Sequence, residues 1–201
     1  MNMYVIKWTS DFERWINRLR DRPTRIRLLR RLEKAQRGLL GDVRPVGDGV
    51  YEMREFYGPG WRMYYVQQDG QLILMLGGGE KSSQTEDITA NSWPQGSGRI
   101  VMTAKIATSD LPEFDMASQL RNEEDLVEYL RQVLADGDSG ELAAALGHIA
   151  KARGMTQIAN ASGIRREALY KALRPNSQPR FETIQRICHA LGVQLTVEQR
   201  P

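Results

Sequence analysis

One lysine of this sequence follows a run of glycines, in the stretch LGGGEKSSQ at residues 76–84. Glycines followed by Lys-Ser at the end of an apolar segment are typical of the phosphate-binding loops of nucleotide-binding proteins. Such a loop requires a glycine directly before the lysine, and here Glu80 precedes Lys81. It also requires a parallel strand–helix–strand setting, which the neighbouring segments do not favour. We therefore exclude a nucleotide-binding loop, and ask which other residues Lys81 can join.

Three segments near Lys81 alternate apolar and polar side chains, at 50–57, 61–68 and 71–77. Tight-turn sequences separate them, Gly-Pro-Gly at 58–60 and Asp-Gly at 69–70. Short turns between alternating segments predict an antiparallel meander. The face that we expect to pack against helices carries Tyr51, Met53, Trp61, Met63 and Tyr65.

The opposite face of this meander holds the residue types that can act on RNA. A short first loop would pair residue 54 with residue 64, and places Arg54, Phe56, Arg62 and Tyr64 on that face. Guanidinium groups bind phosphates and aromatic rings stack on bases, so the combination suits RNA. The same pattern also fits a solvated face with cross-strand ion pairs, such as Glu52 with an arginine.

A second group of candidate residues lies at 155–174, in MTQIANASGIRREALYKALR. Thr156 can cap a short helix, Gly163 permits a sharp turn, and a second helix then follows with Ala168, Leu169 and Ala172 inward. A short helix, a turn with glycine and a polar second helix are typical of a helix-turn-helix. The side chains expected to point outward from the second helix are Arg165, Arg166, Glu167, Tyr170 and Lys171.

Charge is unevenly distributed along the 201 residues, although the formal net charge is only +3. Residues 1–37 carry a net charge of +7, residues 103–141 carry −7, and residues 148–186 carry +6. Any one block can be a solvated helix face. Two basic blocks more naturally indicate two contacts with polyanions.

Several classes of protein are excluded by composition. The single cysteine, Cys188, rules out a disulfide framework and a cysteine-based zinc site, and it falls among the apolar positions of the last helix. His148 and His189 lack a metal-ligand spacing, so we expect neither a metal nor a cofactor. No signal peptide and no apolar run of roughly 20 residues is present, so we expect a cytoplasmic protein that makes no membrane contact.

The remaining elements divide the chain into two halves. Ser10 begins a capping box before the apolar stripe of a first helix, and Pro23 suits the first turn of a second, which ends at Gly38. The two helices form a hairpin with an arginine-rich outside. In the second half, Asn122 and Ser139 can each cap a further helix. The apolar face of the helix after Asn122 carries Leu126, Val127, Leu130, Val133 and Leu134, and that of the helix after Ser139 carries Leu142, Leu146, Ile149 and Ala150.

These elements predict an α+β fold. We expect a domain with a helical hairpin and an antiparallel sheet at residues 1–90, a linker at 91–102, and an all-helical domain at 103–201. The helix-turn-helix part of the second domain spans about 140–195. Phe181, Ile184, Ile187, Cys188 and Leu191 are expected to line its closing helix.

Three stretches of the first half resemble the RelE/ParE superfamily of bacterial toxins. They are FERWINRLRDRPTRIRLLRRLEKAQRGLLGD, VGDGVYEMREFYGPGWRMYYV and LILMLGGGEKSSQTEDI, and the resemblance covers about residues 3–90. It is closest to the HigB-like branch, the addiction module killer proteins. Residues 115–196 independently resemble the HigA-like antidote proteins of the same modules, in FDMASQLRNEEDLVEYL, LAAALGHIAKARGMTQIA and REALYKALRPNSQPRFETIQRICHALGV. The chain therefore resembles a toxin fused to its antitoxin.

The toxin resemblance implies a ribosome-dependent mRNA endonuclease that works without metal. Such chemistry must activate a ribose 2′-OH, stabilise charge on the phosphate and protonate the leaving oxygen. The positions that match are Arg54, Arg62 and Lys81, with Tyr64 as a helper. Relatives usually continue into a final helix after the residues matching Asp87-Ile88, whereas this chain turns into NSWPQGSG.

The antidote resemblance implies a dimeric repressor that binds its own operator DNA through a Cro/C1-type helix-turn-helix. Operator contacts are expected from Arg165, Arg166, Tyr170 and Lys171, and phosphate contacts from Thr156 and Gln157. Relatives often carry a serine cap where Arg165 stands, so the operator sequence is expected to differ. The acidic block at 103–141 would neutralise the basic 1–37 hairpin, within one chain or between chains.

Two other functions stay open at this point. The chain can be a DNA-binding regulator whose toxin-derived half no longer cleaves RNA. It can also be a gyrase inhibitor of the ParE type, which the short 58–60 turn and the Arg/Lys face make less favourable.

Overall fold

The computed structural model describes residues 4–83, 108–197 and 199. The chain divides into two compact units, Met1–Asp115 and Met116–Pro201. The described residues form one five-stranded sheet and eight α-helices, so the predicted α+β fold class is confirmed. The predicted linker at 91–102 lies outside the described residues, as do the boundaries of the two predicted domains.

The first unit begins with a strand and a helical hairpin. β1 covers Val5–Trp8, α1 covers Ser10–Arg18 and α2 covers Arg22–Gln36. The predicted cap at Ser10 is wrong, because the Thr9 hydroxyl accepts the hydrogen bond from the Phe12 amide at 3.2 Å and Ser10 is the first helical residue. Pro23 does lie in the first turn of α2, after the capping carboxylate of Asp21.

A mixed sheet follows the hairpin. Its other strands are β2 (Val43–Gly47), β3 (Val50–Glu55), β4 (Trp61–Gln68) and β5 (Leu72–Glu80), and the 3-10 turn η1 follows at Lys81–Ser83. The order is β1-β5-β4-β3-β2. The predicted antiparallel meander β3-β4-β5 is confirmed, and β1 adds to it in parallel beside β5.

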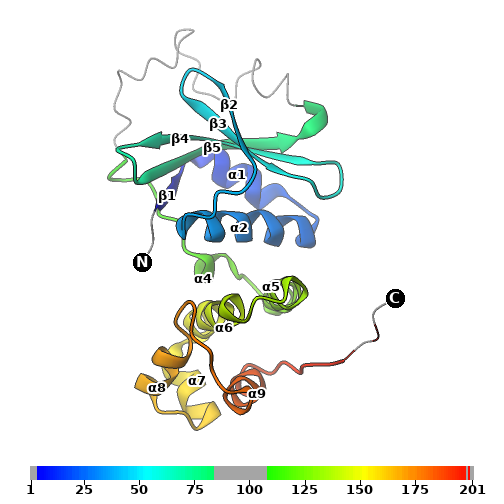
Figure 1. Cartoon of the computed structure of the whole chain (residues 1–201), viewed down its shortest axis with the longest axis vertical. Coiled ribbons are helices and arrows are strands. Elements are labelled where there is room, and N and C mark those ends of the chain that lie inside the picture. The colour runs from blue at the N-terminus through cyan, green and yellow to red at the C-terminus, as the bar shows by residue number, and fades with distance from the viewer. Residues whose placement is uncertain (1–3, 84–107, 198, 200–201) are drawn as a thin grey trace. The chain divides into compact units, whose positions relative to one another are not determined.

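One face of the sheet packs on α1 and α2 (Figure 1). Met53, Met63 and Met75 on this face are fully buried, as is Phe12 of α1. The hairpin is less arginine-rich on its outside than predicted, because Arg25 is only 1% and Arg30 only 6% exposed.

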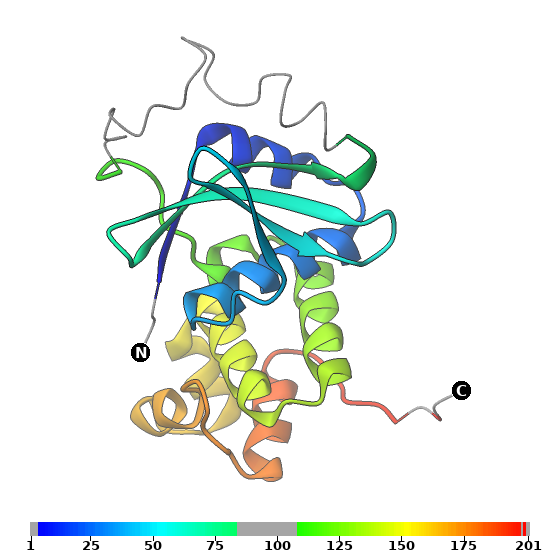
Figure 2. The same cartoon turned by 45° about the horizontal axis from the view of Figure 1, so that its top comes forward.

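The second unit contains only helices among its described residues. They are α4 (Met116–Gln119), α5 (Glu123–Asp136), α6 (Ser139–Arg153), α7 (Met155–Ser162), α8 (Arg166–Ala172) and α9 (Phe181–Ala190). α5 packs beside α6, and α7 packs against α9 (Figures 1 and 2). The core includes Ala145, Leu146, Ile149, Leu169 and Ile187, all fully buried.

Two predicted caps of the second unit have different outcomes. Asn122 caps α5, since its side-chain oxygen accepts from the Asp125 amide at 2.9 Å. Ser139 does not cap α6, because the Asp138 carboxylate accepts from the amides of Gly140 and Glu141 instead.

Several residues expected in the core of the second unit are exposed. Leu126, Leu130 and Val133 are buried as predicted, but the predicted stripe of α5 was too wide. The exposed residues that the pattern placed inside are Val127, Leu134, Ala168 and Phe181.

Candidate functional site

The two arginines of the predicted site lie directly opposite each other on β3 and β4. Arg54 pairs with Arg62, and Glu52 pairs with Tyr64. The predicted register, in which Arg54 faces Tyr64, is wrong by two residues. Because side chains alternate with a period of two, this even shift leaves all four residues on the predicted face.

Two carboxylates hold these arginines. Glu52 is only 2% exposed, and its Oε2 lies 3.6 Å from Nε of Arg62 while its Oε1 lies 4.0 Å from Nε of Arg54. Asp42, which precedes β2, accepts from Nη2 of Arg54 at 2.6 Å and from its Nε at 3.1 Å. The expectation of a cross-strand ion pair between Glu52 and an arginine is therefore confirmed.

Phe56 gives the pair an exposed aromatic neighbour. The side chain is 71% exposed, and the guanidinium carbons of Arg54 and Arg62 lie 5.7 and 5.9 Å from its ring centroid. Both distances fall within the range of cation–π attraction. Arg62 itself is only 4% exposed, so Phe56 and the partly buried Arg54 form the accessible part of this group.

The glycine run sets which way the end of β5 faces. The β4–β5 register shifts between Tyr64 and Tyr65, so Gly77 and Gly79 lie opposite Tyr64 and Arg62 on the arginine face. Gly78 then faces α1, where a Cβ would lie 2.4 Å from the ring of Trp15, so only glycine fits without a shift.

Lys81 directly follows the glycines and the last residue of β5. Its amide donates to the carbonyl of Gly60 at 2.8 Å, which fixes the backbone beside the start of β4. Lys81 begins η1, so the alternation of β5 ends at Glu80 and does not by itself assign the face of the Lys81 side chain. Lys81 is exposed.

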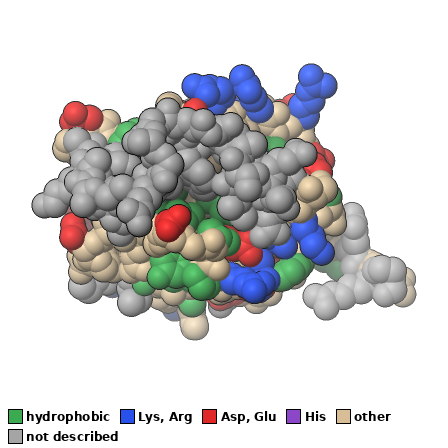
Figure 3. Space-filling view, turned by 90° about the horizontal axis from the view of Figure 1, so that it is seen from above, with side chains coloured by type: hydrophobic (Ala, Val, Ile, Leu, Met, Phe, Trp, Pro, Cys, Tyr) green, Lys and Arg blue, Asp and Glu red, His purple; other side chains and the backbone are tan. Residues whose placement is uncertain are grey.

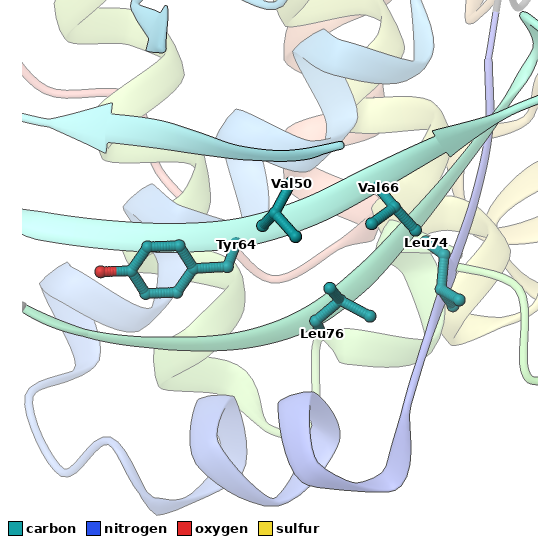
Figure 4. Close-up of a cluster of buried hydrophobic side chains, with 5 residues drawn as sticks. All are labelled: Val50, Tyr64, Val66, Leu74 and Leu76. Carbon is teal, nitrogen blue, oxygen red and sulfur yellow. The ribbon is translucent and has the colours of Figure 1, made fainter. Parts of the chain in front are cut away.

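Tyr64 has a different environment from the other predicted site residues. Its side chain is 1% exposed and lies in an apolar cluster with Val50, Val66, Leu74 and Leu76. The four aliphatic side chains gather at one end, and the hydroxyl points away from them (Figure 4). Tyr64 therefore supports the face from within, rather than lying at its surface.

The arginine group can bind an anion and orient it, and it carries its own countercharges. Viewed from above Figure 1, the described surface shows separate groups of Lys and Arg side chains, with Asp and Glu among them (Figure 3). No cluster of three potential metal-ligating side chains occurs among the described residues. Sequence reasoning missed Asp42, which lies in a loop without a periodic signal.

The six predicted DNA-contacting residues are all exposed on α7, α8 and the turn between them. Gly163 makes that turn with a φ of 64°, and Arg186 of α9 donates to the Ser162 carbonyl at 2.9 Å. Arg166 lies with its guanidinium carbon 5.5 Å from the ring centroid of Tyr170. The exposed group consists of Thr156, Gln157, Arg165, Arg166, Tyr170 and Lys171.

Two details of this surface refine the predictions. Thr156 does not cap α7, because the helix begins at Met155 after Gly154 and has no side-chain cap. Arg165 occupies the cap position of α8, likewise without a side-chain cap hydrogen bond, as its residue type leads one to expect.

Cys188 is a core residue, as predicted. Its side chain is 3% exposed, and burial raises the pKa of the thiol above its ordinary value. A thiol with a raised pKa is a poor nucleophile. Within the described part of the chain, no helix combines the length and the hydrophobicity that crossing a bilayer requires.

Comparisons with known proteins relate the chain to addiction modules. Residues 110–199 match the family model described as "Probable addiction module antidote protein". One relative from Haemophilus influenzae (strain Rd) is 42% identical over 92 residues, which are 46% of this chain and 95% of the relative. A second from the same organism is 37% identical over 83 residues, which are 41% of this chain and 84% of the relative. Both are described as uncharacterized proteins.

Over the residues that each one matches, the chain belongs to the family of each of these relatives. Its antidote-like part, 110–199, includes nearly all of the second compact unit, which supports an antitoxin role in an addiction module. No solved structure matches the chain.

Proposed function

We propose that this chain is a toxin and its antitoxin in one polypeptide. The observation that carries the proposal is the antidote match at 110–199, preceded by a separate unit whose sheet contains the cross-strand pair Arg54 and Arg62. Less than half of this chain covers 95% of one relative and 84% of the other, as expected if the chain joins proteins that also occur separately.

In this proposal the first unit is a latent ribosome-dependent mRNA endonuclease of the RelE type. Arg54 and Arg62 bind the scissile phosphate and stabilise its charge, and Lys81 moves a proton or adds positive charge. Tyr64 supports the positions of the arginines.

The second unit, by this proposal, represses its own promoter as a dimer through a Cro/C1-type helix-turn-helix. α8 with Arg165, Arg166, Tyr170 and Lys171 enters the major groove, while Thr156 and Gln157 of α7 approach the phosphates. The exposure of all six side chains supports this assignment. The mRNA partner is the one that the ribosome is translating, and no cofactor takes part.

The test is the induction of residues 1–90 alone in bacteria, beside the whole chain. We expect the fragment to arrest growth and to cut mRNA on translating ribosomes, and the whole chain to do neither. Arg62→Ala should abolish cleavage, whereas Arg44→Ala, at an exposed position of β2, should not. A soluble, folded fragment that inhibits supercoiling instead of translation would place the first unit with gyrase inhibitors.

A second candidate function follows from the buried ion pair. Because Glu52 already occupies Arg62, the first unit can have become a structural part of a DNA-binding regulator. A folded fragment that neither arrests growth nor cleaves mRNA, together with operator binding by the whole chain, would favour this function.

A further inference from the structure

Residues 108–114 lie along the open edge of the sheet in the first unit. β1 is the edge strand beside β5, so one side of its backbone is free to pair with another segment. The Phe114 amide donates to the Ile6 carbonyl at 2.8 Å, and the Trp8 amide donates to the Pro112 carbonyl at 3.4 Å. Lys7 and Glu113 form an antiparallel bridge between these bonds.

The side chains of this segment contact both faces of the sheet. Phe114 is 2% exposed, with its ring centroid 5.6 Å from that of Trp8, on the helix-covered face. Leu111 packs against the apolar cluster that contains Tyr64, on the arginine face. The segment therefore contacts the edge of the sheet on both of its faces.

Polar contacts fix the two ends of the segment. The ammonium group of Lys7 donates to the Thr108 carbonyl at 2.6 Å. The side-chain amide of Gln36, at the end of α2, donates to the Phe114 carbonyl at 3.1 Å. Charge complementarity has little part in these contacts, because the acceptors are backbone carbonyls.

The antidote-like part of the chain begins at residue 110, within this segment. We propose that residues 108–114 are the docking segment by which the antidote holds the toxin-like unit, and that the β1 edge with Trp8 is its receptor site. The proposal rests on the fused toxin–antitoxin function proposed above. Under this proposal, the main contact between the antidote and the toxin-like unit is not the charge attraction between the basic hairpin and the acidic block. It is the addition of a strand to the sheet, together with one buried aromatic side chain.

The proposal predicts that the attachment survives cutting of the chain before residue 108. A recognition site for a specific protease, inserted between Gly96 and Ser97 of the full chain, allows the folded protein to be cut. The two fragments are then followed by gel filtration over a dilution series. We expect wild-type fragments to co-elute, and Phe114→Ala to raise their dissociation constant at least about a hundredfold, the usual effect of truncating a buried phenylalanine.

Two further variants make the test decisive. Phe181→Ala, at a 63% exposed phenylalanine of the second unit, is the matched control and should leave the fragments together. If uncut Phe114→Ala unfolds, Leu111→Asp at a partly buried position serves in its place. Wild-type fragments that separate on cutting, or folded variants at 111 and 114 whose fragments stay together as tightly as wild type, overturn the proposal.

The readout is separate from that of the proposed function. Co-elution requires neither RNA cleavage nor operator binding, so an inactive first unit would leave it unchanged. Conversely, an active fragment 1–90 combined with fragments that separate would retain the toxin function and reject the docking segment.

Discussion

The two basic surfaces of this protein differ in how their charges are held. On the sheet, Arg62 is buried and Arg54 half-buried, and Glu52 and Asp42 hold their guanidinium groups. On α7 and α8, the charged side chains are exposed, and the Arg166 guanidinium contacts the hydroxyl and ring of Tyr170. Held arginines favour an exact geometry at a reacting centre, whereas exposed ones favour long-range attraction to a phosphate backbone.

The largest effect should follow the removal of the buried carboxylate on the sheet. Glu52→Ala leaves Arg62 as an uncompensated buried charge, so we expect the free energy of unfolding of the first unit to fall by about 3–5 kcal/mol. All four tryptophans lie in residues 1–93, so urea unfolding followed by tryptophan fluorescence reports on that part of the chain.

Glu55→Ala is the matched control for this change. Its ion pair with Arg27 is 3.0 Å long but partly exposed, so the loss should stay below about 1 kcal/mol. Equal losses at positions 52 and 55 would mean that the sheet arginines are no more firmly held than surface pairs.

An intermediate effect is expected on the helical surface. Arg166→Ala and Lys171→Ala should each reduce by about one the steepness with which log affinity for promoter DNA falls with log salt concentration. Because both side chains are exposed, the stability of the second unit should change by no more than about 0.5 kcal/mol. Fluorescence anisotropy with a duplex from the chain's own promoter measures the slope.

Arg131 of α5 provides the control, since its side chain is 69% exposed and lies on another helix of the same unit. Arg131→Ala should leave the salt slope unchanged. If all three variants give the wild-type slope, α8 does not contact the phosphates.

The smallest effect concerns the helix caps of the two units and their response to pH. Hydrogen bonds from Thr24 hold the pKa of Asp21 below its ordinary value of 3.8. Its stabilisation of α2 is therefore complete above pH 4 or so and is lost as the pH falls through the lower folded-state pKa. Asp21→Asn should flatten this part of the dependence of the first unit's unfolding on pH, followed by tryptophan fluorescence.

Asn122 of α5 is a cap that does not titrate. Asn122→Ala should lower the free energy of unfolding of the second unit by about 1 kcal/mol at pH 3 and pH 7 alike, measured by circular dichroism.

For the Asp21 prediction, the contrary result is a free energy of unfolding of the first unit that depends on pH in the same way for wild type and Asp21→Asn. That result would show that other groups govern the response of this unit to acid.

Side-chain alternation made the arginine face predictable, but not the partners on it. The loop between β3 and β4 extends from Phe56 to Gly60 and is longer than the turn sequence suggested, with the Gly60 amide bonded to the Tyr57 carbonyl. The resulting register shift was even, so the correct residues still met. Asp42 was missed because it is brought to Arg54 by tertiary packing alone.

Other differences between prediction and structure arose where two neighbouring residues can both cap a helix, or where a strand is too short to show a periodic pattern. Thr9 and Ser10 are both good caps, as are Asp138 and Ser139, and only backbone geometry selects between them. β1 has four residues and was not predicted, since a strand this short has little periodicity of its own.

The alternate facing of the glycines in β5 limits how the length of the glycine run at 77–79 can change. Residues 77, 78 and 79 face alternate sides of the sheet, so one inserted or deleted glycine would reverse the facing of the part of β5 on one side of the change. Two inserted glycines would restore the facing. Variation in the length of this run should therefore occur in steps of two.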